Sequence, residues 1–93
     1  MLFRRMRKKP KPRGTVAKEM SRAEMDKYMS KIGKHIHSKR QAKSSQDTFA
    51  YEINMSRSAL AGYEKGGDMY LSTFIKLLYG LDITPEDFFK ELK

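Results

Sequence analysis

The stretch Ser45-Gln-Asp-Thr-Phe-Ala-Tyr-Glu-Ile-Asn-Met-Ser-Arg-Ser-Ala-Leu-Ala-Gly-Tyr-Glu-Lys-Gly66 decides the fold. Ser45 and Ser56 each precede a short run that can form a helix. A serine in that place accepts a hydrogen bond from a free N–H group of the first helical turn. The stretch therefore predicts two short helices, over 46–52 and 57–65, joined by a tight turn.

The spacing within this stretch meets the steric demands of a helix-turn-helix, in which two helices cross steeply. Ala50 is small enough to stand where the helices approach each other. Asn54 tolerates the left-handed backbone conformation that the turn needs. Leu60, four residues after the second cap, offers an apolar anchor for the second helix. We expect the following residues to face inward: Phe49, Ala50, Ile53, Leu60 and Tyr63.

The outward positions of the second helix are short or basic side chains. They are Arg57, Ser58, Ala61 and Gly62. Short side chains leave room for the helix to enter the major groove of DNA, and arginine is the side chain that most often reads guanine there. The sequence therefore predicts a recognition helix over 57–65.

A long amphipathic helix is predicted before this stretch. Ser21-Arg22-Ala23-Glu24 is a capping-box pattern, and it predicts a helix over about 22–43. Gly33 lies within that helix and is expected to weaken it by up to about 1 kcal/mol relative to alanine. The apolar residues on one face of this helix are Met25, Tyr28, Met29, Ile32 and Ile36.

Two further helices are predicted after it. The segment 71–81 predicts a helix that ends at Asp82, and Thr84-Pro85-Glu86-Asp87 is typical of a helix start. We expect a buried stripe made of Leu71, Phe74, Ile75, Leu77, Leu78 and Leu81, and a last apolar face made of Phe88, Phe89 and Leu92. No segment alternates with the period of a strand, so the chain is predicted to be all-α with five helices.

Charge is unevenly distributed along the 93 residues. The net charge is +9, from 20 Lys and Arg against 11 Asp and Glu. Residues 1–14 contain seven bases and no acid, whereas residues 66–93 carry a net charge of −2. Such an asymmetry indicates a polyanionic partner, and the prolines of the basic segment favour nucleic acid over a membrane surface. We therefore expect a flexible basic arm over 1–19 and one domain over 20–93.

Most of the chain resembles a known family. The run formed by Ser45, Gln46, Ala50, Ser56, Leu60, Glu64 and Gly66 resembles the signature of the lambda-repressor/Cro-like helix-turn-helix family of phage and bacterial regulators. The segments 32–40 and 71–89 resemble its first helix and its last two helices, so the likeness covers about residues 31–90. The resemblance implies a five-helix lambda-repressor-like domain, sequence-specific binding of double-stranded DNA, and regulation of transcription, with repression expected.

The resemblance also implies roles for individual residues. Gln46 would bind a phosphate and brace the recognition helix, Arg57 and Ser58 would reach base edges, and Arg40 would pair with Glu64. The full set of expected DNA-contacting residues is Ser45, Gln46, Ser56, Arg57, Ser58, Ala61, Gly62 and Lys65, with Lys39 and Lys43 in the preceding helix.

The sequence departs from the family pattern in five places. The loop before Ser45 and the loop 66–70 each look about one residue short, and the first also lacks the usual glycine-leucine pair. Asn54 replaces a common glycine, and Gly62 stands where many relatives place a long polar side chain that reads bases. Asp68 lies where the family tends to have basic or neutral polar residues, so phosphate contacts by that loop are not expected.

Other classes of function have little support in the sequence. There is no cysteine, and His35 and His37 are two residues apart, so on a helix they point to different faces and do not suit a metal site. No activated nucleophile is recognisable, so we expect neither an enzyme nor a cofactor. No apolar run suits a membrane span or a signal peptide, and the cytoplasm is the expected location, with association to the nucleoid when DNA is bound.

Three expectations about partners remain. A homodimer on DNA is expected, because one recognition helix reads few base pairs; Phe89 is the residue expected to stay partly exposed and to contact the second copy. An alternative function is that of an antitoxin, which binds a toxin protein and its own operator. A second alternative is a non-specific binder that acts through the basic arm.

Overall fold

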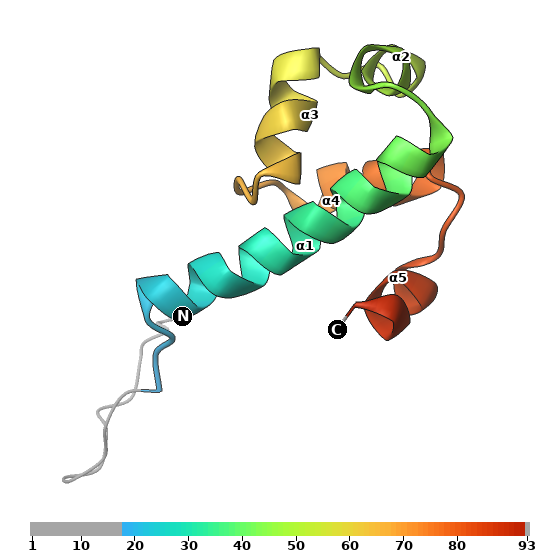
Figure 1. Ribbon diagram of the computed structural model, residues 1–93. Coiled ribbons are helices and arrows are strands. Elements are labelled where there is room, and N and C mark those ends of the chain that lie inside the picture. The colour runs from blue at the N-terminus through green and yellow to red at the C-terminus, as the bar shows by residue number, and fades with distance from the viewer. Residues whose placement is uncertain (1–17, 93) are drawn as a thin grey trace, which may run out of the picture.

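The computed structural model of the chain describes residues 18–92, and within them it contains five helices and no strand (Figure 1). They are α1 (Arg22–Lys43), α2 (Gln46–Glu52), α3 (Arg57–Glu64), α4 (Leu71–Gly80) and α5 (Pro85–Glu91). The all-α prediction is confirmed, and each expected helix is present with its ends within about one residue. The basic arm expected over 1–19 falls almost entirely outside the described residues. Within the described residues, no helix has both the length and the hydropathy that a membrane span requires.

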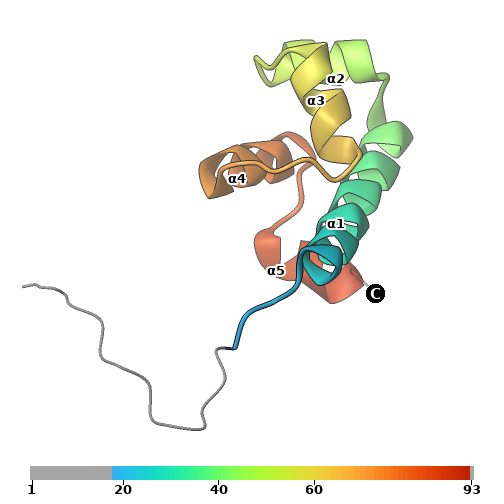
Figure 2. The same ribbon diagram turned by 90° about the vertical axis from the view of Figure 1, so that its left-hand side faces the viewer.

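The helices form one compact unit built on α1. Helix α3 packs against both α1 and α2, while α5 packs against α4. In both views α2 and α3 lie at one end of the unit and α5 lies towards the other, with α4 between them (Figures 1 and 2). The chain thus presents the α2–turn–α3 segment at one end, away from its C-terminal helix.

Side-chain caps begin four of these helices. The hydroxyl oxygens of Ser21, Ser45, Ser56 and Thr84 each accept a hydrogen bond from the backbone N–H three residues ahead, at 3.0–3.2 Å. Each cap satisfies an N–H group that has no partner within the helix, and such a cap typically contributes about 1 kcal/mol. The starts of these four helices are therefore encoded locally, as the sequence predicted.

Left-handed residues end α2, α3 and α4. Asn54, Gly66 and Asp82 have φ values of 57°, 97° and 58°. In each case the N–H of the following residue donates to a carbonyl five positions back, as from Met55 to Ala50 at 2.8 Å, which is the hydrogen bond of a Schellman motif. The same backbone device thus turns the chain after three successive helices, and it confirms the turn expected at Asn54.

The core lies where the helices meet. Its buried apolar residues are Ile36, Phe49, Ala50, Leu60, Phe74, Leu77, Leu78 and Phe88. The prediction of a fully buried stripe on α4 is wrong for Leu71 and Ile75, whose side chains are 74% and 44% exposed. The side of a helix that faces a core spans an arc of about 100°. The six apolar residues of the segment 71–81 spread over a wider arc than this, so some of them stay exposed.

Gly33 has a different role from the one expected. A Cβ atom at this position would lie 2.7–2.8 Å from backbone atoms of Tyr63, Glu64 and Gly66. Gly33 therefore lets the C-terminal end of α3 approach the backbone of α1. This close packing offsets the loss of helix stability that a glycine causes inside α1.

Candidate nucleic-acid interface

Helix α3 has one anchored face and one open face. Leu60 and Glu64 are buried, with 0% and 6% of their surface exposed. The exposed residues on the other side are Arg57, Ser58, Gly62 and Lys65. Ala61 is half-buried between the two faces. No atom would lie within 4 Å of a Cβ added at Gly62. The open face is therefore narrow and free of bulky side chains apart from Arg57 and Lys65.

Glu64 connects the three helices of the motif. Its carboxylate accepts hydrogen bonds from Arg40 Nε at 2.8 Å and Arg40 Nη2 at 3.0 Å, and it lies 2.8 Å from Nδ1 of His37 on the same helix, α1. It also accepts a bond from Nε2 of Gln46 on α2 at 3.0 Å. The expected pair of Arg40 and Glu64 is confirmed, and it is part of a larger network.

The charge of Glu64 is stabilised in spite of its burial. Burial by itself raises the pKa of this carboxyl, but the hydrogen bonds from Arg40, His37 and Gln46 and the positive charge of Arg40 outweigh it. The pKa falls to about 2. A carboxylate that stays ionised can only accept hydrogen bonds, so it determines how its neighbours are oriented.

The first turns of α2 and α3 are joined by Arg57. Its Nε lies 3.4 Å from the side-chain oxygen of Gln46 and 3.3 Å from the carboxylate of Asp47. Gln46 thus contacts both the buried Glu64 and the exposed Arg57. This agrees with a bracing role for Gln46, while a phosphate contact by Gln46 stays a prediction.

The two capping serines lie at the same end of the motif. The Ser45 and Ser56 hydroxyl oxygens cap α2 and α3, and both residues are exposed. The Ser45 hydroxyl also donates to the hydroxyl of Thr48 at 3.0 Å. Their expected contacts with phosphate stay predictions.

Lys39 and Lys43, unlike the other residues expected to contact DNA, lie beside acids of the C-terminal segment. Nζ of Lys39 lies 2.6 Å from the carboxylate of Glu91 on α5, and Nζ of Lys43 lies 3.4 Å from that of Asp82. Both ammonium groups are therefore paired with acids of the C-terminal segment. The structure does not bring them together with Arg57 and Ser58.

The two histidines lie on different faces of α1, as predicted. His37 contacts Glu64, whereas the ring of His35 lies 4.7 Å from the ring of Phe88 and its Nε2 lies 3.5 Å from Glu91. His37 belongs to the motif network, a role that the sequence reasoning did not identify. No local pattern marks it, because its partner is 27 positions away in the sequence.

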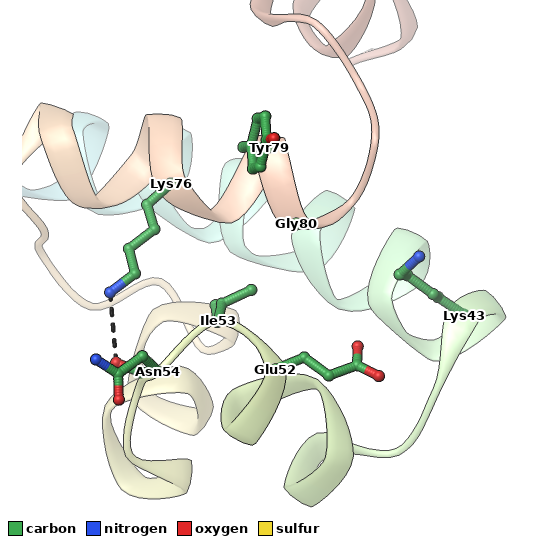
Figure 3. Close-up of a pocket in the computed structure, with 7 residues that line it drawn as sticks. All are labelled: Lys43, Glu52, Ile53, Asn54, Lys76, Tyr79 and Gly80. Atoms are coloured by element: carbon green, nitrogen blue, oxygen red, sulfur yellow. Dashed lines mark hydrogen bonds between the residues drawn. The ribbon is translucent and has the colours of Figure 1, made fainter.

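A hollow lies between α2 and α4, and none of its lining residues belongs to α3 (Figure 3). Lys76 of α4 donates a hydrogen bond from Nζ to the backbone oxygen of Asn54 at 3.3 Å across it. Ile53 and Tyr79 also line it. The hydrogen bond ties α4 to the turn between α2 and α3.

Asp47 is a further residue of the site that sequence reasoning missed. It is an acid in the first turn of α2, and such an acid is common at a helix start for reasons of helix electrostatics alone. Only the crossing of α2 and α3 brings it to Arg57.

Comparison of the chain with protein-family models, with curated proteins and with solved structures finds no match.

Proposed function

We propose that the protein binds double-stranded DNA sequence-specifically, as a small transcriptional regulator that acts as a repressor. The observation that carries this proposal is the division of α3 into two faces. Leu60 and Glu64 hold one face against α1 and α2, while Arg57, Ser58 and Gly62 lie open on the other. A rigidly held helix with a narrow polar face is the element that enters a major groove in helix-turn-helix proteins.

The five-helix order supports a lambda-repressor-like arrangement, with α2 and α3 as the motif. In this arrangement the N-terminal end of α3 meets the bases, and the N-terminal end of α2 meets the phosphate backbone. Arg57 and Ser58 would then read base edges, whereas Ser45, Gln46 and Ser56 would contact phosphates. Ala61 and Gly62 would approach the groove closely, and Lys65 would contribute positive charge.

Charge is also consistent with this orientation. Most of the positive charge precedes residue 66, and the segment 66–93 has a net charge of −2. The C-terminal segment would therefore face away from DNA, and its acids already pair with Lys39 and Lys43. We expect these two lysines to contribute less to binding than Arg57 does.

The proposal is tested by selecting bound sites from random duplexes and by measuring the affinity of variants for a selected site and for random DNA. Arg57→Ala and Ser58→Ala should lower affinity for the selected site more than for random DNA, by about 1–3 kcal/mol of discrimination for Arg57. Lys90→Ala is the matched control, because Lys90 is an exposed base on α5. Failure of any sequence to be enriched would refute sequence-specific binding.

A further inference from the structure

Arg57 is held by its inner nitrogen. Both of its contacts with α2, to Gln46 at 3.4 Å and to Asp47 at 3.3 Å, use Nε. Within residues 18–92 the Arg57 side chain donates its hydrogen bond from Nε, and the terminal nitrogens Nη1 and Nη2 donate none. The guanidinium group is planar, so fixing Nε restricts the direction in which these two nitrogens point.

The orientation of Gln46 follows from the buried carboxylate behind it. The carboxylate of Glu64 is ionised and can only accept hydrogen bonds, so the NH2 group of the Gln46 amide donates to it, at 3.0 Å. The amide oxygen of Gln46 must then point the other way, towards α3, where it needs a donor. Arg57 Nε supplies that donor, and the carboxylate of Asp47 forms an ion pair with the same guanidinium group, 3.3 Å from Nε.

We propose that Asp47, together with Gln46, positions Arg57 to read a guanine in the major groove. A guanine edge presents two acceptors, O6 and N7, which match the two terminal nitrogens of an arginine whose Nε contacts α2. Asp47 is a positioning residue here, because it acts through Arg57. This inference rests on the proposed DNA-binding function.

The charge of Asp47 has a second consequence. Arg57 already has an acceptor in the free protein, and the carboxylate of Asp47 repels phosphates at the same end of the motif. Both effects oppose binding to arbitrary DNA, where Arg57 finds phosphates but no matching base edge. Asp47 therefore favours specificity at the expense of affinity.

Two substitutions separate these effects. Asp47→Asn removes the charge but keeps a side-chain oxygen that can accept from Nε, whereas Asp47→Ala removes both. Affinity for random DNA should rise by a similar factor, about twofold to fivefold, in both variants, because each loses one negative charge of an exposed pair. Only Asp47→Ala should lose preference for guanine at the position that Arg57 reads, by about threefold or more.

Glu52→Gln is the matched control. Glu52 is an exposed acid at the other end of α2, so it tests the loss of one charge from the same helix away from Arg57. Thermal stability is measured alongside, since an acid in the first turn of α2 also favours the helix. A purely structural role would change stability without changing base preference.

A second measurement tests the positioning without DNA. Exchange of the Arg57 Nε hydrogen with water, followed by NMR, should be slow in the wild type, faster in Asp47→Ala and intermediate in Asp47→Asn. Unchanged exchange in Asp47→Ala, or an unchanged guanine preference in that variant, would overturn the proposal. If the wild type selects no sequence while exchange responds as expected, the proposed function fails and the contact with Asp47 stands.

Discussion

At the scale of single residues, Glu64 joins the three helices of the motif. It is a buried charge whose partners come from α1 and α2. A buried ion pair adds little net stability over an apolar contact, but removing one partner leaves the other charge unpaired. Arrangements of the three helices that leave Glu64 or Arg40 buried without a partner are therefore disfavoured.

Glu64→Gln should lower the free energy of unfolding by about 3–5 kcal/mol, because Arg40 would remain buried without its counter-charge. Thermal or urea unfolding at neutral pH measures this loss. The Glu52→Gln variant, which changes an exposed acid of the motif, should unfold close to the wild type. Equal stability of Glu64→Gln and the wild type would show that the network contributes little.

The same carboxylate predicts a pH dependence. The pKa of Glu64 is about 2 in the folded protein against an ordinary value of 4.5, so the unfolded chain takes up the proton first as pH falls. Its contribution to stability is fully present above about pH 4.5 and is lost as pH falls towards 2. Unfolding curves at several pH values should show a smaller loss over this window in Glu64→Gln than in the wild type. Parallel losses in the two proteins would contradict this assignment.

At the scale of elements, the close approach of α1 and α3 depends on a single glycine. Gly33 has three backbone atoms of the α3 end within 2.8 Å of the place where a Cβ would stand, whereas Gly62 on the open face of α3 has nothing within 4 Å. The same chemical change at these two positions should therefore have opposite effects on stability.

Gly33→Ala should destabilise the protein by about 1–3 kcal/mol, because backbone atoms cannot move aside cheaply. Gly62→Ala should stabilise it by about 0.5–1 kcal/mol, because alanine favours a helix over glycine and meets no neighbour. Differential scanning calorimetry of both variants measures the two effects. A lower melting temperature for Gly62→Ala would mean that its surroundings are more crowded than the structure indicates.

At the scale of the whole molecule, an apolar groove lies where α1, α4 and α5 meet. The groove is lined by Met29, Ile32, Met69, Leu71, Phe74 and Phe89, together with Asp68. The side chain of Phe89 is 50% exposed, as the sequence predicted, and its ring lies 5.7 Å from that of Phe74.

We predict that two copies bind one operator and that Phe89 contributes to their contact. Phe89→Ser should reduce the fraction of two-copy complexes on a selected site, because it removes apolar surface from the groove. Tyr79→Ser, which changes an exposed aromatic residue outside this groove, is the control. Sedimentation of the complexes measures the number of copies, and one copy on a non-palindromic site would contradict the prediction.

The basic segment predicts a strong dependence of binding on salt. Residues 1–14 carry seven positive charges, and each phosphate that they neutralise adds about 0.9 to the slope of log affinity against log salt concentration. Deleting residues 1–14 should therefore lower this slope measurably. An unchanged slope after the deletion would show that the segment does not contact DNA.

Local chemistry determined the elements of this protein, and the sequence alone was sufficient to predict them. Ser45, Ser56 and Thr84 cap helices through hydrogen bonds to the backbone N–H three residues ahead. Asn54 turns the chain by adopting a left-handed backbone conformation. Such interactions depend on neighbours in sequence, so they can be recognised in sequence.

Tertiary structure alone decided how these elements meet. Several contacts join residues of different helices. Asp47 contacts Arg57, His37 lies beside Glu64, and Lys39 pairs with Glu91. Position 33 must be glycine because the end of α3 lies against it. Which apolar residues of α4 are buried was likewise decided by the arc that faces the core, and periodicity does not reveal the width of that arc. These features depend on the angles at which the helices cross, and packing of side chains from separate helices sets those angles.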